Sequence, residues 1–350
     1  MAAYTEIDDP SAFFQAFLYT GTGANRTITL PGNSDLKFDW YWYKKRNAEQ
    51  HHRMFDTSRG LSLELYPDLT AGDSSATYFN NQQANSFDII AHDSATNTGD
   101  DTFANWQWKC NGGTTATNTT GSIDSVVQAN TDAGFSIALA TAPGSNGHWS
   151  FGHGLGVKPD MVITKQRDGG GWWTWHKDLT NQTTYYLGLN QTDAETNEAN
   201  MWGGGMTSSV IGVSSPNSTL VNKNYIAYCF ASKQGYSKFG KYVGNGNADG
   251  AFIYTGFKPA FLLIKGIDEA RNWFIYDNTR PGRNVTNLYL LADSNQTEQT
   301  GNASGIDFVS NGFKMRNTFL SLNKVNINYI YMAFAENPFT TSTAIPTTAR

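Results

Sequence analysis

The sequence predicts an all-β protein made of three tandem antiparallel β-sandwich modules of the jelly-roll type. Short hydrophobic and aromatic runs alternate with Gly- and Asn-rich turns along the chain, which is the pattern of strands joined by hairpins. No segment has the periodicity of an amphipathic helix, and the one stretch with a helix-favouring composition, residues 193–200, is short. A common arrangement of strands occurs three times, which indicates an internal repeat.

The clearest copy of this arrangement occupies residues 235–265. A first aromatic strand precedes a Gly-Asn cluster at 244–247, whose residues tolerate positive φ in a turn. Residues 251–254 predict a short second strand. The Phe-Lys-Pro sequence at 257–259 predicts a break, and the apolar run 260–264 predicts a buried third strand. We therefore expect a strand–turn–strand–turn–strand unit here.

Each copy carries two lysines, seven residues apart, that bracket a hydrophobic strand. The pairs are Lys37 and Lys44, Lys158 and Lys165, and Lys258 and Lys265. Further along, each copy has an aromatic strand that closes on an aspartate, and these residues are Asp56, Asp178 and Asp277. The opening lysines lie 121 and 100 residues apart, so the first interval must hold an insertion or a linker. A period near 100 residues is too long for a solenoid repeat and suits a whole small β-sandwich.

These repeats divide the chain into six predicted parts. They are an N-terminal docking segment at 1–16, module 1 at 17–110, a Thr/Asn/Gly-rich bridge at 111–134, module 2 at 135–233, module 3 at 234–339 and a polar tail at 340–350. The composition of the bridge suits a flexible tether. Its apolar residues Ile123, Val126 and Val127 suggest instead that the bridge lies as a strand along a neighbouring module.

The composition argues against several classes of function. Of the 350 residues, 14% are aromatic and only 16% are charged, a mixture typical of secreted or virion β proteins with ample buried area. The net charge of −5 and the lack of a Lys/Arg run give no support for nucleic-acid binding. No run approaches the length of a membrane span, and the first ten residues contain no apolar core segment. We therefore expect neither membrane insertion nor a cleaved signal peptide.

We expect no cofactor and no metal ion. No phosphate- or dinucleotide-binding Gly-rich loop stands in a strand–helix context. His148 and His153 share a Gly-rich loop without a nearby third ligand, so loop or packing roles are favoured over a zinc site. Cys110 and Cys229 fall at matching places in two copies. A disulfide could join them, but we expect two buried thiols.

Paired carboxylates are the enzymatic alternative, because glycoside hydrolysis uses two acids at one site. Asp56, Asp178 and Asp277 are the obvious candidates, but they recur once per copy. A catalytic pair must be unique and close together, whereas a recurring aspartate suits a shared turn or strand-end hydrogen bond. We therefore expect a protein that is not an enzyme, and a polysaccharide-degrading protein is the less favoured alternative.

Aromatic residues carry the binding hypothesis. Three tryptophans follow the triglycine at 169–171, and strand alternation sends Trp173 and Trp175 to one face and Trp172 to the other. One face could be an exposed platform for a sugar or a subunit, although core packing is the alternative for each tryptophan. The candidate ligand- or partner-contact residues are Trp149, Trp172, Trp173, Trp175, His176 and Trp202. The clustered phenylalanines near the N-terminus, Phe13, Phe14 and Phe17, are candidates for docking to another protein.

Three stretches resemble modules of tailed-bacteriophage virion proteins that are common in marine phages. They are IDDPSAFFQAFLYTGTGANRTITLPGNSDLKFDW at the start, GSIDSVVQANTDAGFSI with GHGLGVKPDMVITKQR in the middle, and GYSKFGKYVGNGNADGAFIYTGFKPAFLLIK with NYIYMAFAENPF near the end. The similarity covers nearly the whole chain. It departs from the family in the aromatic run 40–43 and in Cys110, which follows the closing strand of module 1.

The resemblance implies a tail fibre or tail-appendage protein with lectin-like, concanavalin A-like sandwiches. Such a protein would be made in the host cytoplasm and reside in the virion, and it would bind other virion proteins and a host-surface glycan or protein. The resemblance also implies a homo-oligomer, with a trimer favoured, because repeated weak sites on one particle gain effective concentration. The alternative is a purely structural head-fibre, decoration or tail-adaptor protein.

Overall fold

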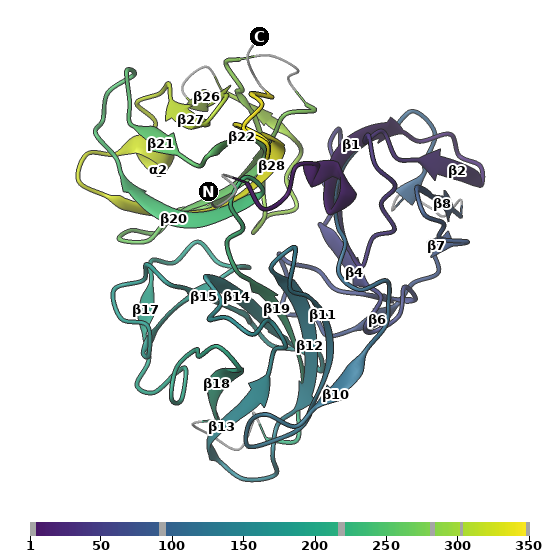
Figure 1. Cartoon of the computed structure of the whole chain (residues 1–350), viewed down its shortest axis with the longest axis vertical. Coiled ribbons are helices and arrows are strands. Elements are labelled where there is room, and N and C mark those ends of the chain that lie inside the picture. Colours follow the sequence, from purple (N-terminus) through teal and green to yellow (C-terminus); the bar gives the residue numbers. More distant parts are fainter. Residues whose placement is uncertain (1–4, 91–95, 216–220, 281–283, 302–303, 348–350) are drawn as a thin grey trace.

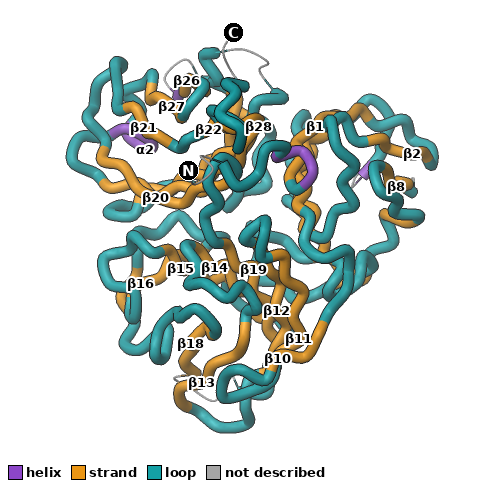
Figure 2. Tube along the Cα trace, in the orientation of Figure 1, coloured by secondary structure: helices purple, strands orange, loops and turns teal. Residues whose placement is uncertain are grey.

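The computed structural model describes residues 5–90, 96–215, 221–280, 284–301 and 304–347 (Figures 1 and 2). Strands hold 44% of the chain and helices 3%, and every strand pair is antiparallel in the described residues. The helices with defined bounds are the single turns η1 (Pro10–Ala12) and α2 (Leu320–Asn323). The predicted all-β class with antiparallel sandwich-like layers is therefore confirmed.

The first unit has a four-stranded sheet whose strands, in spatial order, are β1 (Phe14–Thr20), β9 (Thr102–Trp108), β3 (Trp40–Lys45) and β4 (Arg53–Asp56). A second sheet contains β2 (Arg26–Thr29), β8 (Ser86–Ile89) and β7 (Phe79–Asn80). The two sheets enclose an aromatic core, which includes Phe17, Tyr41 and Phe87. The hairpin of β5 (Leu63–Glu64) and β6 (Ser74–Ser75) lies between β4 and β7 in the chain.

The second unit has an eight-stranded sheet. Its strands, in spatial order, are β10 (Ala116–Asn118), β11 (Ser125–Asn130), β12 (Phe135–Thr141), β19 (Asn224–Phe230), β14 (Met161–Gln166), β15 (Trp172–His176), β16 (Tyr185–Gly188) and β17 (Thr196–Asn197). The pair β13 (Gly147–Gly152) and β18 (Val210–Ser215) forms the second layer. The predicted bridge supplies β10 and β11, so it is part of this sheet rather than a flexible tether.

The third unit has a six-stranded sheet. Its strands, in spatial order, are β20 (Ser237–Val243), β28 (Asn328–Pro338), β22 (Phe257–Gly266), β23 (Trp273–Asp277), β24 (Leu288–Leu291) and β25 (Gln299–Thr300). The second layer contains β21 (Phe252–Tyr254), β27 (Gly312–Met315) and β26 (Ile306–Val309). The break expected at 257–259 is wrong, because β22 continues through Pro259 with two shifts in register.

One strand order is common to the three large sheets. Four strands of each unit pair in the same order, namely β1-β9-β3-β4, β12-β19-β14-β15 and β20-β28-β22-β23, and the second unit adds β10 and β11 ahead of its set. The register makes Trp40, Met161 and Phe261 equivalent, because each faces the matching residue of the last strand of its unit. The repeat seen in the sequence is therefore a repeat of topology.

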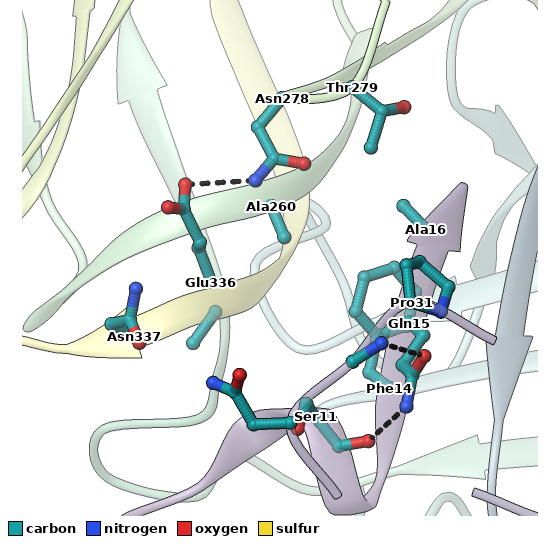
Figure 3. Close-up of a pocket in the computed structure, with 13 residues that line it drawn as sticks. Ser11, Phe14, Gln15, Ala16, Pro31, Ala260, Asn278, Thr279, Glu336 and Asn337 are labelled. Carbon is teal, nitrogen blue, oxygen red and sulfur yellow. Dashed lines mark hydrogen bonds between the residues drawn. The ribbon is translucent and has the colours of Figure 1, made fainter. Parts of the chain in front are cut away.

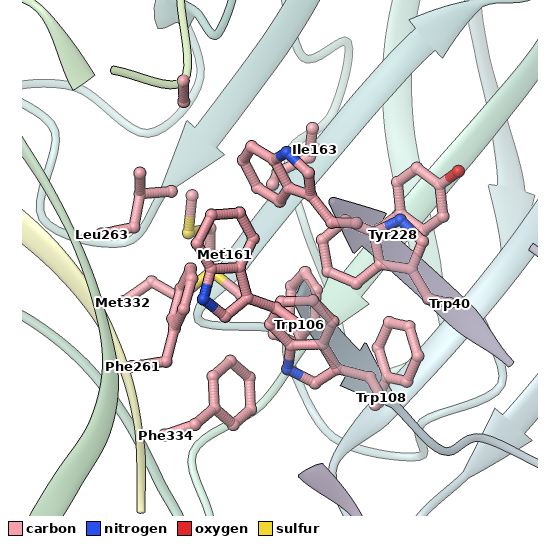
Figure 4. Packing of buried hydrophobic residues seen from close by; sticks show 14 of the residues in the cluster. Trp40, Trp106, Trp108, Met161, Ile163, Tyr228, Phe261, Leu263, Met332 and Phe334 are labelled. Carbon is pink, nitrogen blue, oxygen red and sulfur yellow. The ribbon is translucent and has the colours of Figure 1, made fainter. Parts of the chain in front are cut away.

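The three large sheets turn one face toward a shared central core (Figures 1 and 4). Aromatic rings from different units meet there. Trp40 stacks on Tyr228 with centroids 4.7 Å apart, and the rings of Trp108 and Phe261 lie 5.5 Å apart. Each unit also keeps its own core between its two layers. The central strands β3 and β14 are consequently buried along their whole length.

The units close into a ring through three equivalent junctions. A loop of each unit pairs by its main chain with the end of the third strand of another. The amide of Asp73 donates to Arg167 O (2.7 Å), that of Glu195 to Ile267 O (2.8 Å) and that of Glu298 to Arg46 O (2.8 Å). These bonds join unit 1 to unit 2, unit 2 to unit 3, and unit 3 back to unit 1. The last junction closes the ring without a chain connection.

A ring nitrogen reinforces each junction at an equivalent position. Trp172 Nε1 donates to Tyr66 O and Trp273 Nε1 donates to Gly188 O, both at 2.8 Å. In unit 1 the position holds His52, whose Nε2 lies 2.9 Å from Leu291 O. Trp42 Nε1 donates to the Nδ1 atom of His52, so Nε2 carries the proton and donates to that carbonyl.

The described segments near the two ends of the chain pack on each other and on the third unit. The amide of Glu6 donates to Gln234 O (3.1 Å), and Asp8 accepts from the amide of Ser342 (2.6 Å). β1 already begins at Phe14, inside the predicted docking segment 1–16. Both cysteines are free and buried, as the sequence predicts.

Candidate functional site

The tryptophans proposed for ligand contact lie inside the molecule. Trp149, Trp172, Trp175, His176 and Trp202 have at most 3% of their surface exposed, and Trp173 is half-buried against Tyr225. Two of the indole nitrogens donate internally: Trp175 Nε1 to Gln182 O and Trp202 Nε1 to Tyr185 O, both at 2.8 Å. The exposed platform expected around Trp172 is therefore wrong, because both faces of this sheet are covered.

The N-terminal phenylalanines are core residues as well. Phe14 lies in the central core, 4.9 Å from Trp108 and 5.3 Å from Phe334 between ring centroids. Phe17 is buried in the core of the first unit, and Phe13 is half-buried against the central core. Phe13 and Phe14 pack against the central core and Phe17 packs inside its own unit, so the buried Phe14 and Phe17 offer no docking surface in the folded chain.

The recurring aspartates form buried structural ion pairs. Asp56 pairs with Arg59 (2.5 Å) and Asp277 with Arg280 (2.7 Å), and all four side chains are fully buried. Each carboxylate also accepts from another unit: Tyr228 Oη donates to Asp56 (2.9 Å) and Trp106 Nε1 to Asp277 (3.0 Å). Burial alone would raise the pKa of Asp277, but Arg280 and the hydrogen-bond donors hold it below its ordinary value. These carboxylates are engaged in ion pairs rather than poised for proton transfer.

The equivalent position in the second unit is His176, not the predicted Asp178. His176 faces Met161 across the sheet, as Asp56 faces Trp40 and Asp277 faces Phe261. Burial lowers the pKa of His176 to about 3, so this imidazole is neutral. Leu179 stands three residues later, where the other units have arginine. The junction between units 2 and 3 therefore lacks the buried aspartate–arginine pair of the other two.

The described residues contain no group of three or more His, Cys, Asp or Glu side chains that could hold a metal ion. His148 lies on β13 and His153 follows that strand. His153 is buried, with Nε2 3.2 Å from Thr207 O and Nδ1 accepting from the amide of Leu155. Its two ring nitrogens are thus engaged with the main chain.

Two exposed aromatic side chains lie elsewhere, on β21. Phe252 has 49% and Tyr254 has 45% of its surface exposed, while Ile253 between them points into the core of the third unit. Alternation along the strand places both rings on the outer face of the β21-β27-β26 sheet. We call these two residues the β21 aromatic pair. Large exposed rings on one face of a strand form a surface suited to stacking.

The β21 aromatic pair has no counterpart in the other units. The equivalent strand of unit 1, β2, carries Thr27 and Thr29 on its outer face, and β13 of unit 2 carries His148 and Ser150. A residue that the fold requires should recur with the fold. An exposed pair present in one unit only is thus a candidate for a binding role.

Charged side chains surround the β21 aromatic pair. Lys238 Nζ lies 5.0 Å from the centroid of the Tyr254 ring and donates to Tyr254 O at 2.8 Å. Burial, aided by the nearby charge of Lys177, lowers the pKa of Lys238. Across the ladder Phe252 faces Lys314, whose Nζ lies 2.6 Å from Asp249. The pair is thus bordered by fixed hydrogen-bond donors and an exposed carboxylate.

Comparison with protein families gives one match, which spans residues 9–338 and is described as a domain of unknown function, DUF7483. The chain belongs to this family. A search of curated proteins finds no match to it. The structure adds that no described helix is long and apolar enough to cross a membrane.

Sequence reasoning missed the aromatic pair of this DUF7483 chain, although its signal was present. Residues 251–254 were expected to form a strand, and Phe252 and Tyr254 alternate with Ile253 in it. The three tryptophans at 172, 173 and 175 gave a stronger aromatic signal, but large hydrophobic side chains favour burial as much as binding. The comparison of equivalent positions between the three units is what separates the two roles.

Proposed function

We propose that this chain is a virion protein of a tailed phage, a tail fibre or tail-appendage component that binds a cell-surface glycan without covalent chemistry. The observation that carries the glycan role is the β21 aromatic pair, exposed in one unit only. The virion role rests on the resemblance of the repeated modules to phage proteins. Other virion proteins, and further copies of the chain as a trimer, are the proposed partners.

The geometry of the aromatic pair suits a saccharide. Residues two apart on a strand are separated by about 6.7 Å, so the two rings can stack on neighbouring sugar units. Aromatic faces attract the C–H groups of sugars, and Lys238, Lys314 and Asp249 supply donors and acceptors for hydroxyl groups at the border. The buried ion pairs of Asp56 and Asp277 support a binding role over hydrolysis.

A purely structural virion role is the second candidate. Its support is a group of exposed apolar residues at the end of the third unit, comprising Val243, Leu320 and Val325, each at least 50% exposed. Such a patch suits contact with another protein. Periodate distinguishes the two functions. It oxidises the vicinal diols of sugars and so removes binding to a glycan, whereas a contact with another protein does not depend on these diols.

The test measures binding of the purified chain to intact host cells, with and without periodate oxidation of their surface glycans. We expect saturable, periodate-sensitive binding that the double variant Phe252→Ala/Tyr254→Ala weakens by about 1–3 kcal/mol, as the loss of two stacking side chains would. Thr29→Ala, at the equivalent strand of unit 1, is the matched control. Binding that is unchanged by periodate or by the double variant would contradict the proposal, and absence of binding would favour the structural role.

A further inference from the structure

A crevice opens between the first and third units, beside the junction that closes the ring (Figure 3). Its volume is about 270 Å³, with Phe14 and Gln15 on one wall and Asn278 and Glu336 on the other. A second groove of about 700 Å³ follows β26 and shares Glu336 and Asn337 with the crevice. Glu336 and Asn337 thus line both hollows. The groove has the size of a ligand site, about 300–1,000 Å³, and the crevice is slightly smaller.

A local irregularity of the sheet presents Glu336 at this place. The ladder between β22 and β28 pairs Lys258 with Asn337 and then Pro259 with Ala335, which leaves Glu336 without a partner residue. Pro259 has no N–H to give to the ladder, and an extra residue of this kind redirects a side chain and bends the strand. In the second unit the equivalent strand starts only at Met161 and pairs regularly. The irregularity is thus not required by the common fold.

The polar groups of the crevice are held in place by the protein. Asn278 Nδ2 donates to the Glu336 carboxylate at 2.8 Å, and Lys258 Nζ lies 2.8 Å from the same group. On the opposite wall Gln15 makes three hydrogen bonds to the main chain of its own unit, each between 2.9 and 3.0 Å. Side chains fixed in this way lose little freedom when a ligand binds.

The lining favours a neutral ligand rich in hydroxyl groups. Glu336 is the one carboxylate among the residues that line the crevice, and Lys258 balances its charge. The other polar side chains are amides and hydroxyls, namely Ser11, Gln15, Asn33, Asn278, Thr279 and Asn337. Such groups offer both hydrogen-bond donors and acceptors, and a sugar hydroxyl can pair with either because it both donates and accepts. An anion or a cation would gain no net attraction.

We propose that the crevice and the groove bind a neutral oligosaccharide, with Glu336 as the central acceptor of sugar hydroxyl protons. The chain of sugars runs from Gln15, past Asn337, to Ser310 in the groove. This site is separate from the β21 aromatic pair and rests on the proposed function only in the class of ligand. Because units 1 and 3 both line it, a bound saccharide also stabilises the closed ring.

The test is a titration of the ¹⁵N-labelled full chain with maltotetraose, cellotetraose and mannotetraose, read from the side-chain amide signals of Asn and Gln residues. At least one of these sugars is expected to shift the signals of Gln15, Asn278 and Asn337. Glu336→Gln should weaken that binding about tenfold, because it removes a charged acceptor. Asn337→Ala should weaken it as well without touching Lys258, and Glu198→Gln, an exposed residue of unit 2, serves as the control.

The outcomes separate the two proposals. The crevice site is overturned if none of the three sugars binds at millimolar concentration, or if Glu336→Gln and Asn337→Ala bind as the wild type does. It also falls if the shifts are confined to the β21 sheet and vanish in Phe252→Ala/Tyr254→Ala, a result that supports the aromatic pair alone. Binding at the crevice that persists in that double variant, with no binding to cells, supports this site and removes the proposed glycan-attachment function.

Discussion

The buried aspartate–arginine pairs of this protein lie at contacts between units. Asp277 contacts Arg280 of its own unit and Trp106 of the first, so the carboxylate neutralises one charge and anchors a neighbour. The second unit lacks all three members of this network. His176 replaces the aspartate, Leu179 replaces the arginine, and Met332 of the third unit replaces the hydrogen-bond donor. Removing one partner alone would leave a buried charge, which explains why all three differ together.

Asp277→Ala is therefore expected to destabilise the protein by about 3–5 kcal/mol, because it leaves the Arg280 guanidinium buried without its partner. Asp178→Ala, at the half-exposed aspartate of the second unit, is the matched control and should change stability by less than about 1 kcal/mol. The free energy of unfolding from denaturant titration measures both. Equal effects of the two substitutions would show that Asp277 has no special structural role.

A second residue-scale feature is the buried lysine of each junction. Lys44, Lys165 and Lys265 occupy equivalent positions and are inaccessible to solvent. Lys165 Nζ donates to Thr70 O at 3.2 Å and Lys265 Nζ to Thr192 O at 2.7 Å, so each holds a loop of the preceding unit. Burial lowers the pKa of all three to about 8 from an ordinary 10.5.

These lysines predict how stability changes with pH. Because the folded pKa of Lys265 lies near 8 and the unfolded one near 10.5, the unfolded chain binds more protons between these values. The contribution of Lys265 to stability therefore rises with pH in this window and is constant below it. From pH 8 to 10, wild type should gain about 2 kcal/mol relative to Lys265→Met. Unfolding at each pH measures the difference, and parallel curves would contradict the assignment.

At the scale of elements, the sequence predicts strands well and their surroundings poorly. The alternation of short apolar runs and Gly- or Asn-rich turns locates β20, β21 and β22, because local backbone preferences decide where a strand begins. Exposure could not be predicted in the same way. Alternation assigns one face of a strand to solvent, but β14 and β15 have a sandwich core on one face and the central core on the other.

Burial on both faces of the sheet also explains why the predicted tryptophan site was wrong. Trp172 and Trp175 lie on opposite faces of β15, as predicted, and both faces are buried. The contacts that bury them come from Tyr66, over 100 residues away, and from Gln182 in a following loop. The role of Glu336 could not be predicted for another reason. Its position follows from an extra residue in the ladder between β22 and β28, and the sequence does not show which strands pair.

The ion pair between Arg46 and Glu298 joins elements 252 residues apart, at the closing junction. The contact is two-pronged, at 3.0 and 2.8 Å, and both side chains are mostly buried. A double-mutant cycle of Arg46→Ala and Glu298→Ala should give a coupling free energy of about 1–2 kcal/mol. The pair of Lys314 with the exposed Asp249 should give a much smaller coupling in the same cycle, because solvent screens it. A negligible Arg46–Glu298 coupling would mean that the junction is not formed in solution.

At the scale of the whole molecule, one chain builds what a trimer of single units would build. Each junction uses two different surfaces, one per unit, and a head-to-tail contact of this kind closes after three units. The surfaces through which the units contact each other are buried in this closure, and residues of all three units form the central core (Figure 4). A homo-oligomer of the chain would therefore have to use the outer sheets or the loops at either end of the ring.

The closed ring is the claim on which the crevice site depends, since residues of the first and third units line the crevice together. Disulfide trapping tests it directly. The amide of Gln50 donates to Asn295 O at 2.9 Å, so Gln50→Cys/Asn295→Cys should oxidise rapidly within the monomer. Gln50→Cys with Thr192→Cys, the matching loop position of the second unit, should not. Trapping of the first pair alone is predicted, and failure of that pair, or equal trapping of the second, would contradict the ring.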